Sequence, residues 1–324
     1  MKAVLQDRYG TSATLRIADV DTPVPTAGQV LLQVSAASIH IGDWHLMTGL
    51  PLLARLALGI RAPKQRVRGM DVAGRITAVG ANVTSHLVGD YVFGTANGAF
   101  AEFAVAQADA VVPLPAETTA ERAAALPTSA TTALHAVRDA GKVQAGQRVL
   151  VLGAAGGVGI FAVQIAKALR AHVTGVCSEP KRDLVRSLGA DQVLDYRVDR
   201  VIGSERYDVI VDMGGRRPVR QLRRALTPTG TLVIVGGEGG GRVLGGFERS
   251  LLAPLAGLFS KQKFRGLISV TKEADLLDLK AMVEAGTLRP IIDSTFALSD
   301  TPAAMHRLEE HLAVGKLVIA VHPD

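Results

Sequence analysis

The spacing of hydrophobic residues along the chain changes near residue 113. Before this point, short apolar runs are separated by Gly and Asn, and a representative run is Val30–Ser35. Further runs of this kind cover residues 74–79, 91–93 and 100–104. Short apolar runs with turn residues between them are typical of a closed antiparallel β-barrel. The sequence therefore predicts a β-rich amino-terminal part.

After Pro113–Glu117 the apolar residues follow a helical period, and predicted strands alternate with predicted helices. Strands are expected at Arg148–Leu152, His172–Cys177, Gln192–Leu194, Val209–Val211 and Thr231–Val235. Helices are expected at Ala120–Leu126, Thr132–Ala140, Lys181–Leu188, Val219–Leu226 and Pro302–His311, before a last strand at Lys316–Val321. Such alternation is typical of parallel strands joined by crossover helices, so this part is predicted to be an α/β domain.

A glycine-rich turn follows the predicted strand Arg148–Leu152 and opens a helix that runs to Leu169. Glycines allow a tight turn and let a pyrophosphate approach the backbone N–H groups of the helix N-terminus. A second strand about twenty residues further on completes the pattern of a dinucleotide-binding site. The candidate cofactor contacts in this turn are Gly153, Ala155, Gly156, Gly157, Val158 and Gly159. The alternative is a structural turn without a ligand.

The end of the second strand indicates which dinucleotide binds. An NAD-preferring site carries an acidic residue there for the ribose hydroxyls. This chain has Cys177 and Ser178 at the tip, with Lys181 and Arg182 just beyond. A hydroxyl and two cations suit a 2′-phosphate, so NADP(H) is predicted. Glu179 argues mildly for NAD unless it faces solvent, and the two cations are alternatively an ordinary solvated first turn.

The single cysteine, Cys177, restricts the cellular compartment in which the protein works and the metal sites that it can build. One cysteine excludes a disulfide within the chain and any zinc site built on two or more thiolates. The first residues, 1–7, lack the apolar core of a signal peptide, and the apolar run Leu46–Ile60 is too interrupted to span a bilayer. We therefore expect a cytoplasmic protein without a membrane span.

Charge and aromatic content restrict the partners. The chain has 36 Lys and Arg against 30 Asp and Glu, a net charge of +6, which suits an anionic ligand or surface. Basic residues cluster at Arg55–Arg68 and at Arg216–Arg224. With only 8 Phe, 4 Tyr and 1 Trp, a stacking surface for single-stranded nucleic acid is not expected, so no nucleic-acid partner is predicted.

Seven motifs in order along the chain resemble the medium-chain dehydrogenase/reductase superfamily, specifically its zinc-free quinone-oxidoreductase-like branch. They are Gly69–Gly80, Gly89–Gly94, Gly98–Phe103, Ala123–Pro127, Gly153–Gly159, Ser187–Asp191 and Gly315–Ile319. The resemblance implies an α/β protein with a GroES-like β-barrel catalytic domain, residues 1–122 and 270–324. It also implies a Rossmann NADP(H)-binding domain with a doubly wound parallel sheet, residues 123–269. It further implies a homodimer that pairs along an edge strand at Arg265–Val270.

The resemblance assigns further residues to the cofactor site. Thr132 stands where the family places a hydroxyl against the nicotinamide ribose, and Tyr196 where a tyrosine packs on the adenosine end. Gly236 and Gly237 are expected to contact the nicotinamide through their backbone, since they have no side chain. Lys316 of the closing motif is also assigned to the cofactor. No zinc is predicted, because the family's zinc-ligand positions fall at His40–Gly42, Met70 and Thr128–Ser129.

The candidate catalytic residues are His45, His40 and Asp43. His45 aligns with an active-site tyrosine of quinone reductases in the family and is the leading proton donor or orienting group, with His40 second. His40 stands where a related subgroup carries Asn. Asp43 would orient one of the histidines, or alternatively cap a helix that begins near Trp44. Both histidines are alternatively structural.

A metal-free hydride transfer from NADPH to a quinone, enone or other carbonyl-type substrate is the predicted function. Without a Lewis acid, a negative charge that develops on the substrate oxygen must be stabilised by hydrogen bonds. Three alternatives stay open: a non-catalytic NADPH-binding redox sensor or accessory protein, an alcohol dehydrogenase-type activity, and nucleic-acid binding through the basic clusters.

Overall fold

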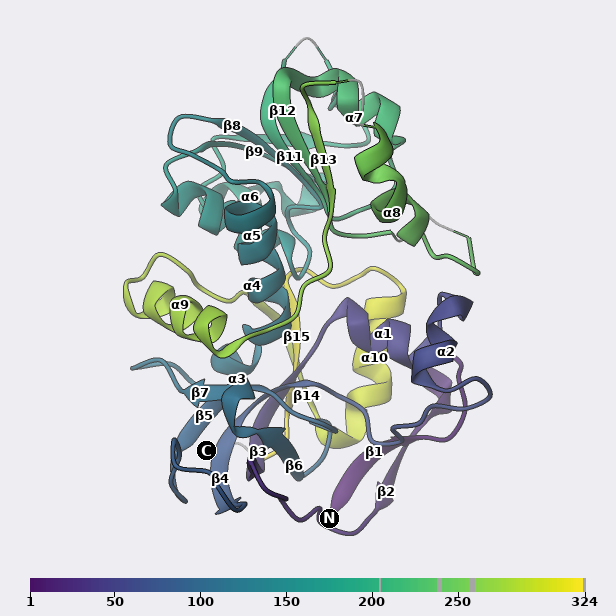
Figure 1. Ribbon diagram of the computed structural model, residues 1–324, viewed down its shortest axis with the longest axis vertical. Coiled ribbons are helices and arrows are strands. Elements are labelled where there is room, and N and C mark those ends of the chain that lie inside the picture. Colours follow the sequence, from purple (N-terminus) through teal and green to yellow (C-terminus); the bar gives the residue numbers. More distant parts are fainter. Residues whose placement is uncertain (204, 238–240, 257–259, 323–324) are drawn as a thin grey trace. The chain divides into compact units, whose positions relative to one another are not determined.

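The computed structural model describes residues 1–203, 205–237, 241–256 and 260–322 (Figure 1). The chain forms two compact units. Unit 1 consists of Met1–Thr131, Thr271–Gly286 and Pro290–Asp324, and unit 2 of Thr132–Val270 and Thr287–Arg289. Helix α4 (Pro127–Leu134) carries the chain from the first unit into the second.

Unit 1 is built on antiparallel strands. Its main sheet has the order β14-β15-β3-β4-β5-β7, and β6 also pairs with β3. All neighbours in it are antiparallel except β14 and β15. The strands are β3 (Gln29–Ile39), β4 (Asp71–Val79), β5 (Tyr91–Thr95), β6 (Phe103–Gln107), β7 (Val111–Pro113), β14 (Ile292–Ala297) and β15 (Lys316–Ala320), with a separate hairpin of β1 (Lys2–Gln6) and β2 (Leu15–Asp19).

Short helices surround this sheet, and one apolar core fills its interior. The helices are α1 (Ile41–Thr48), α2 (Arg55–Leu58), α3 (Ala120–Ala124), α9 (Glu273–Glu284) and α10 (Thr301–Glu309), with 3-10 turns η1 (Ser12–Thr14), η2 (Leu52–Ala54), η3 (Ala108–Ala110) and η6 (Leu298–Asp300). In β3 the side chains from Gln29 to Val34 alternate between partly and fully buried, as expected for a strand with one face on a core. Val34, Val72, Phe100 and Ile319 belong to that core.

Unit 2 is a six-stranded parallel sheet with the order β10-β9-β8-β11-β12-β13. Its strands are β8 (Arg148–Leu152), β9 (His172–Cys177), β10 (Gln192–Asp195), β11 (Tyr207–Asp212), β12 (Leu226–Ile234) and β13 (Lys263–Gly266). The strand order reverses between β8 and β11. In doubly wound sheets, ligands bind at the carboxyl ends of the strands beside such a reversal.

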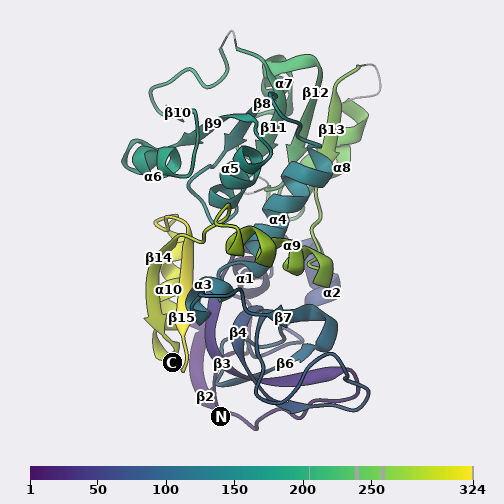
Figure 2. The same ribbon diagram turned by 90° about the vertical axis from the view of Figure 1, so that its left-hand side faces the viewer.

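Helices cover the sheet of unit 2 (Figure 2). Helices α5 (Gly159–Ala168) and α6 (Arg182–Ser187) contact β8, β9 and β10, whereas α7 (Val219–Ala225) and α8 (Phe247–Ala256) contact β12 and β13. A 3-10 turn, η5 (Glu179–Lys181), precedes α6, and a π-helical segment, η4 (His135–Ala140), follows α4. The core of this unit includes Leu150, Ile210, Leu232 and Phe264.

The predicted fold class is confirmed: a GroES-like unit is joined to a doubly wound parallel sheet. Several predicted bounds were wrong. The run at 100–104 becomes a strand only from Phe103, and the helix expected at Thr132–Ala140 begins at Pro127 and turns π-helical at His135. No helix among the described residues is long and apolar enough to cross a membrane.

Candidate functional site

The glycine turn after β8 has the geometry of a phosphate cradle. Gly153 has a φ of +83°, a conformation that L side chains rarely adopt. A Cβ on Gly159 would lie 2.1 Å from the carbonyl oxygen of Gly153, so strand and helix meet only because this residue is glycine. The N–H groups of Gly157 and Val158 have no hydrogen-bond partner in the described part of the chain. They lie at the N-terminus of the ten-residue helix α5, where an anion is favoured.

Backbone hydrogen bonds bring several other predicted cofactor residues to the same edge of the sheet. The N–H of Gly153 donates to Val176 O at 3.1 Å, and the N–H of Tyr196 donates to Cys177 O at 3.2 Å. Gly236 follows β12, and its N–H donates to Asp212 O at 3.3 Å. Since all these strands are parallel, their carboxyl ends meet at one edge. The glycine turn, the tip of β9, Tyr196 and Gly236 therefore lie along that edge.

The tip of β9 offers a mixed set of polar groups. Ser178 and Lys181 are half-buried. Arg182 is engaged by its own element: its Nη1 donates to Glu179 Oε2 at 2.9 Å, and its Nη2 donates to Val193 O at 3.2 Å. Glu179 is thus held by a cation of its own turn. Burial raises the pKa of the Cys177 thiol to about 11, so this residue is a packed thiol.

Two groups at this edge escaped the sequence analysis. The Arg197 guanidinium lies 5.6 Å from the ring centroid of Tyr196, which is 49% exposed, so a further cation stands beside the predicted adenosine contact. Buried Asp212 accepts from Arg249 Nη2 at 2.8 Å and from the N–H of Gly215 at 3.1 Å, which ties helix α8 to the end of β11. A run of Tyr and Arg after a strand was the available signal for Arg197.

Helix α1 of unit 1 carries the three candidate catalytic residues. It begins at Ile41, not near Trp44, and Asp43 caps it from the third helical position by accepting from the His40 N–H at 2.9 Å. His40 is buried, its Nε2 lies 3.5 Å from Asp43 Oδ2, and neither ring nitrogen has a hydrogen-bond partner in the described chain. Burial raises the pKa of Asp43. This geometry makes His40 and Asp43 parts of a helix cap.

His45 has one nitrogen already bonded. Its Nδ1 lies 2.8 Å from the carbonyl oxygen of Leu50, and because a carbonyl only accepts, Nδ1 carries the proton. Burial lowers the pKa of His45, which favours the neutral ring. A neutral ring protonated on Nδ1 presents Nε2 as an acceptor. Of the two roles that the sequence offered for His45, this arrangement therefore suits the orienting group better than the proton donor.

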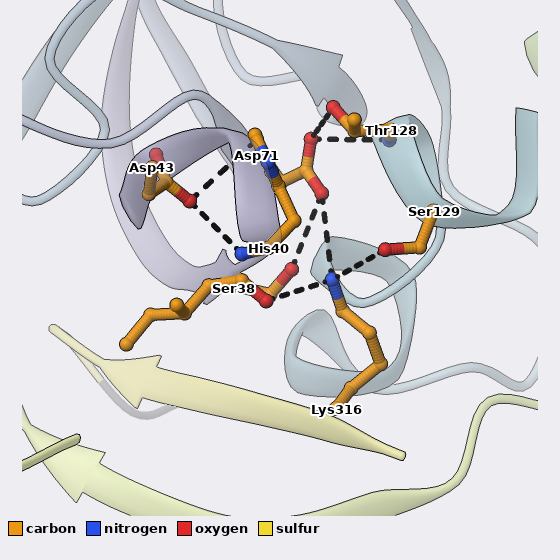
Figure 3. Close-up of polar contacts among 8 residues, drawn as sticks. Ser38, His40, Asp43, Asp71, Thr128, Ser129 and Lys316 are labelled. Atoms are coloured by element: carbon orange, nitrogen blue, oxygen red, sulfur yellow. Dashed lines mark hydrogen bonds and ion pairs between the residues drawn. The ribbon is translucent and has the colours of Figure 1, made fainter. Parts of the chain in front are cut away.

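A buried charge cluster joins four elements of unit 1 (Figure 3). Lys316 of β15 is 1% exposed in its side chain and Asp71 of β4 is 0% exposed, and their charged atoms Nζ and Oδ2 are 3.8 Å apart. Nζ also donates to Ile39 O and to Ser129 Oγ, each at 2.9 Å. Ser38 Oγ donates to Asp71 Oδ2 at 3.3 Å. Burial lowers the pKa of Lys316.

Asp71 also caps helix α4 from another strand. Its Oδ1 accepts from the N–H of Thr128 at 3.1 Å and from the Thr128 hydroxyl. A carboxylate at a helix N-terminus stabilises the helix, here the one that carries the half-buried Thr132. The expectation that Lys316 contacts the cofactor is not supported by this geometry, because its ammonium is buried and its contacts lie within unit 1.

The positions at which the family resemblance expects zinc ligands converge on this cluster. Asp71 follows Met70, Ile39 precedes His40, and Ser129 bonds directly to the Lys316 ammonium. Among the described residues, no three His, Cys, Asp or Glu side chains are grouped so as to hold a metal ion. The absence of zinc stays a prediction.

Comparisons with known proteins cover most of the chain. Family models match as an alcohol dehydrogenase GroES-like domain over residues 26–116 and a zinc-binding dehydrogenase over residues 188–319. The chain is 32% identical to the chloroplastic quinone oxidoreductase of Triphysaria versicolor, with 98% of each chain covered. It is also 32% identical to the mitochondrial NAD(P)H oxidoreductase of Bos taurus, over 99% of this chain and 89% of that one. The solved quinone oxidoreductase from Coxiella burnetii matches with a TM-score of 0.84 at 28% identity, covering 99% of both chains.

Proposed function

Because this chain belongs to the quinone-oxidoreductase-like branch of the medium-chain dehydrogenase/reductase superfamily, we propose that it is an oxidoreductase that transfers a hydride from NADPH to a quinone, an enone or another activated carbonyl compound. The observation that carries the proposal is the pair of unpartnered N–H groups, Gly157 and Val158, at the sheet edge where Ser178, Lys181 and Tyr196 also lie. Those groups suit the pyrophosphate and the adenosine end of a nicotinamide dinucleotide.

NADPH is proposed over NADH because of the charges at the tip of β9. Lys181 and the exposed Arg197 are cations at this edge, and the only acid of the turn, Glu179, is paired with Arg182. An acid that is already paired does not compete for the ribose hydroxyls. The positive charges of Lys181 and Arg197 and the hydroxyl of Ser178 favour a 2′-phosphate. Thr132, Gly236 and Gly237 are proposed to border the nicotinamide end.

When bound, the cofactor supplies the hydride, and the chain's own groups orient the acceptor and its proton source. We assign orientation to His45: its Nδ1–H bond to Leu50 O holds the ring, and Nε2 accepts a hydrogen bond from a water molecule, the proton source. His40 and Asp43 hold the start of helix α1, which carries His45. The proton that completes the reduction then comes from water.

The oligomeric state, the compartment and the partners of the enzyme are proposed on one observation each. The edge strand expected at Arg265–Val270 is β13, which spans Lys263–Gly266 and therefore begins two residues earlier than predicted. Its position at the edge of the unit 2 sheet supports a homodimer paired along that edge. Cys177 is a buried, unpaired thiol, and this supports the proposal that the protein acts in a reducing compartment, the cytoplasm. The scarcity of aromatic residues supports the absence of a nucleic-acid partner.

Steady-state oxidation of NADPH, followed with a panel of quinones, enones and primary alcohols, tests the proposal. The protein is purified in a chelator and assayed for zinc by elemental analysis. We expect turnover of quinones or enones without stoichiometric zinc, and faster turnover with NADPH than with NADH. NADPH binding without turnover of any substrate would instead support a sensor, and turnover that requires zinc would overturn the metal-free mechanism.

A further inference from the structure

One concavity of unit 2 is lined by four arginines. Arg206, Arg220, Arg223 and Arg224 surround a cavity of about 770 Å³ together with Leu226, Pro228, Ser260 and Gln262. We call this set the arginine pocket. No carboxylate is among the lining residues that the structure describes. Three of the four arginines come from the basic cluster 216–224, which the proposed hydride transfer does not use.

The arginine pocket lies at the opposite edge of the sheet from the predicted cofactor contacts. Arg206 directly precedes β11, Arg224 lies near the end of α7 just ahead of β12, and Gln262 directly precedes β13. These are the amino ends of parallel strands. The glycine turn follows the carboxyl end of β8, which is paired in parallel with β11. The two sites are therefore separated by the length of the strands.

Part of the pocket is held in place before any ligand arrives. Arg223 Nε donates to Gln262 Oε1 at 3.2 Å, and Gln262 Nε2 donates back to Arg223 O at 3.2 Å and to Thr227 O at 3.1 Å. This leaves both Nη groups of Arg223 without a partner among the residues described. Arg206 Nη1 donates to two backbone carbonyls, Gly203 O at 3.2 Å and Glu205 O at 3.0 Å. Guanidinium groups fixed in this way lose less entropy when they bind an anion.

Two of the pocket arginines have no acidic partner among the residues that the structure describes. Arg220 and Arg224 form no ion pair within the described ranges, and Glu205, which directly precedes Arg206, accepts from the Tyr207 hydroxyl at 3.1 Å. Four like charges around one concavity repel one another, and an anion relieves that repulsion. Guanidinium forks bind phosphate oxygens two at a time, which is why arginine predominates in phosphate sites.

We propose that the arginine pocket is a second ligand site, which binds a small polyphosphate or phosphate ester with at least two phosphate groups. The cavity volume lies within the usual range for small-molecule sites, roughly 300–1,000 Å³, and is larger than one phosphate needs. The described lining has no aromatic ring on which a base would stack, so we expect the site to recognise phosphate groups and not the bases of a nucleic acid.

Isothermal titration calorimetry of the full chain with inorganic triphosphate tests the site, first alone and then with NADPH present at saturation. We expect one triphosphate per chain, bound equally well in both conditions. The double variant Arg220→Ala/Arg224→Ala should lose about tenfold or more in triphosphate affinity. Its affinity for NADPH should be unchanged, which also shows that unit 2 is folded. Arg220→Lys/Arg224→Lys keeps the charge without the forks and should give an intermediate loss.

Arg61→Ala/Lys64→Ala is the matched control, since it removes the same two charges from exposed positions in unit 1. Equal losses in this control and in the arginine variant would reduce the effect to net charge and overturn the proposal. Displacement of triphosphate by NADPH would do the same, because binding would then belong to the cofactor site. Titration with ATP separates a nucleotide ligand from inorganic polyphosphate. Tight binding of a long RNA alone, with none of triphosphate, would also refute the proposal.

Discussion

Replacing Lys316 with methionine tests whether the buried cluster of unit 1 is held together by charge. The substitution removes the one cation within ion-pair distance of Asp71 in the described part of the chain, and methionine fills a similar volume. It leaves Asp71 with the N–H and hydroxyl of Thr128 and the hydroxyl of Ser38 as donors. It also removes the donor to Ser129 Oγ and Ile39 O. The carboxylate is then buried without a counter-charge.

The expected cost follows from the burial of both groups. Removing one partner of a buried ion pair costs about 3–5 kcal/mol, because the other charge is left uncompensated. Three remaining hydrogen bonds to Asp71 place the loss of Lys316→Met near the lower end, about 3 kcal/mol. The double variant Lys316→Met/Asp71→Asn leaves no buried charge at this pair. We expect the double variant to lose less free energy of unfolding than Lys316→Met alone, by about 1 kcal/mol or more.

Urea unfolding at pH 7, followed by the fluorescence of the single tryptophan, Trp44, reports on this unit, because Trp44 packs on its core. The exposed pair Lys2–Asp19, with a 3.2 Å separation, is the matched control. Lys2→Met should cost less than about 1 kcal/mol, since exposed ion pairs contribute little. A loss below about 1 kcal/mol for Lys316→Met would refute the reasoning. So would a double variant whose loss equals the sum of its two single variants.

Three further predictions concern the cofactor and the helix α1 histidine. Lys181→Ala and Arg182→Ala should each weaken NADPH binding more than NADH binding, because only NADPH carries the 2′-phosphate. Fluorescence titration measures both affinities, and equal losses for the two cofactors would contradict the 2′-phosphate assignment. The lowered pKa of His45 means that the unfolded chain binds a proton more readily than the folded chain, so the free energy of unfolding should fall as pH drops below 6.5. His45→Gln should make the free energy of unfolding, measured in urea between pH 5 and pH 7, less dependent on pH. An unchanged pH dependence would contradict this role of His45. Gly159→Ala places a Cβ 2.1 Å from a backbone oxygen of the same turn and should abolish dinucleotide binding, whereas Gly203→Ala, with its nearest atom at 3.6 Å, should bind normally.

The sequence alone was sufficient for the parts of this protein that depend on local backbone requirements. The turn at Gly153–Gly159 needs glycine for its own conformation and for the contact of helix with strand, so residue type and spacing reveal it. The alternation of strands and helices after residue 113 likewise reflects the burial of each element and predicted the parallel sheet. Both signals lie within short windows of the chain.

Contacts between distant segments were decided only by the tertiary structure. The bond from Lys316 to Ile39 joins residues 277 positions apart, and nothing near either residue indicates the other. Burial in that cluster turned Lys316 from an expected cofactor ligand into an interior charge. The bond from His45 to Leu50 O is close in sequence, yet the backbone path that makes it also settles which nitrogen carries the proton. Residue types show which groups are present, whereas their protonation and partners depend on which other segments exclude water from them.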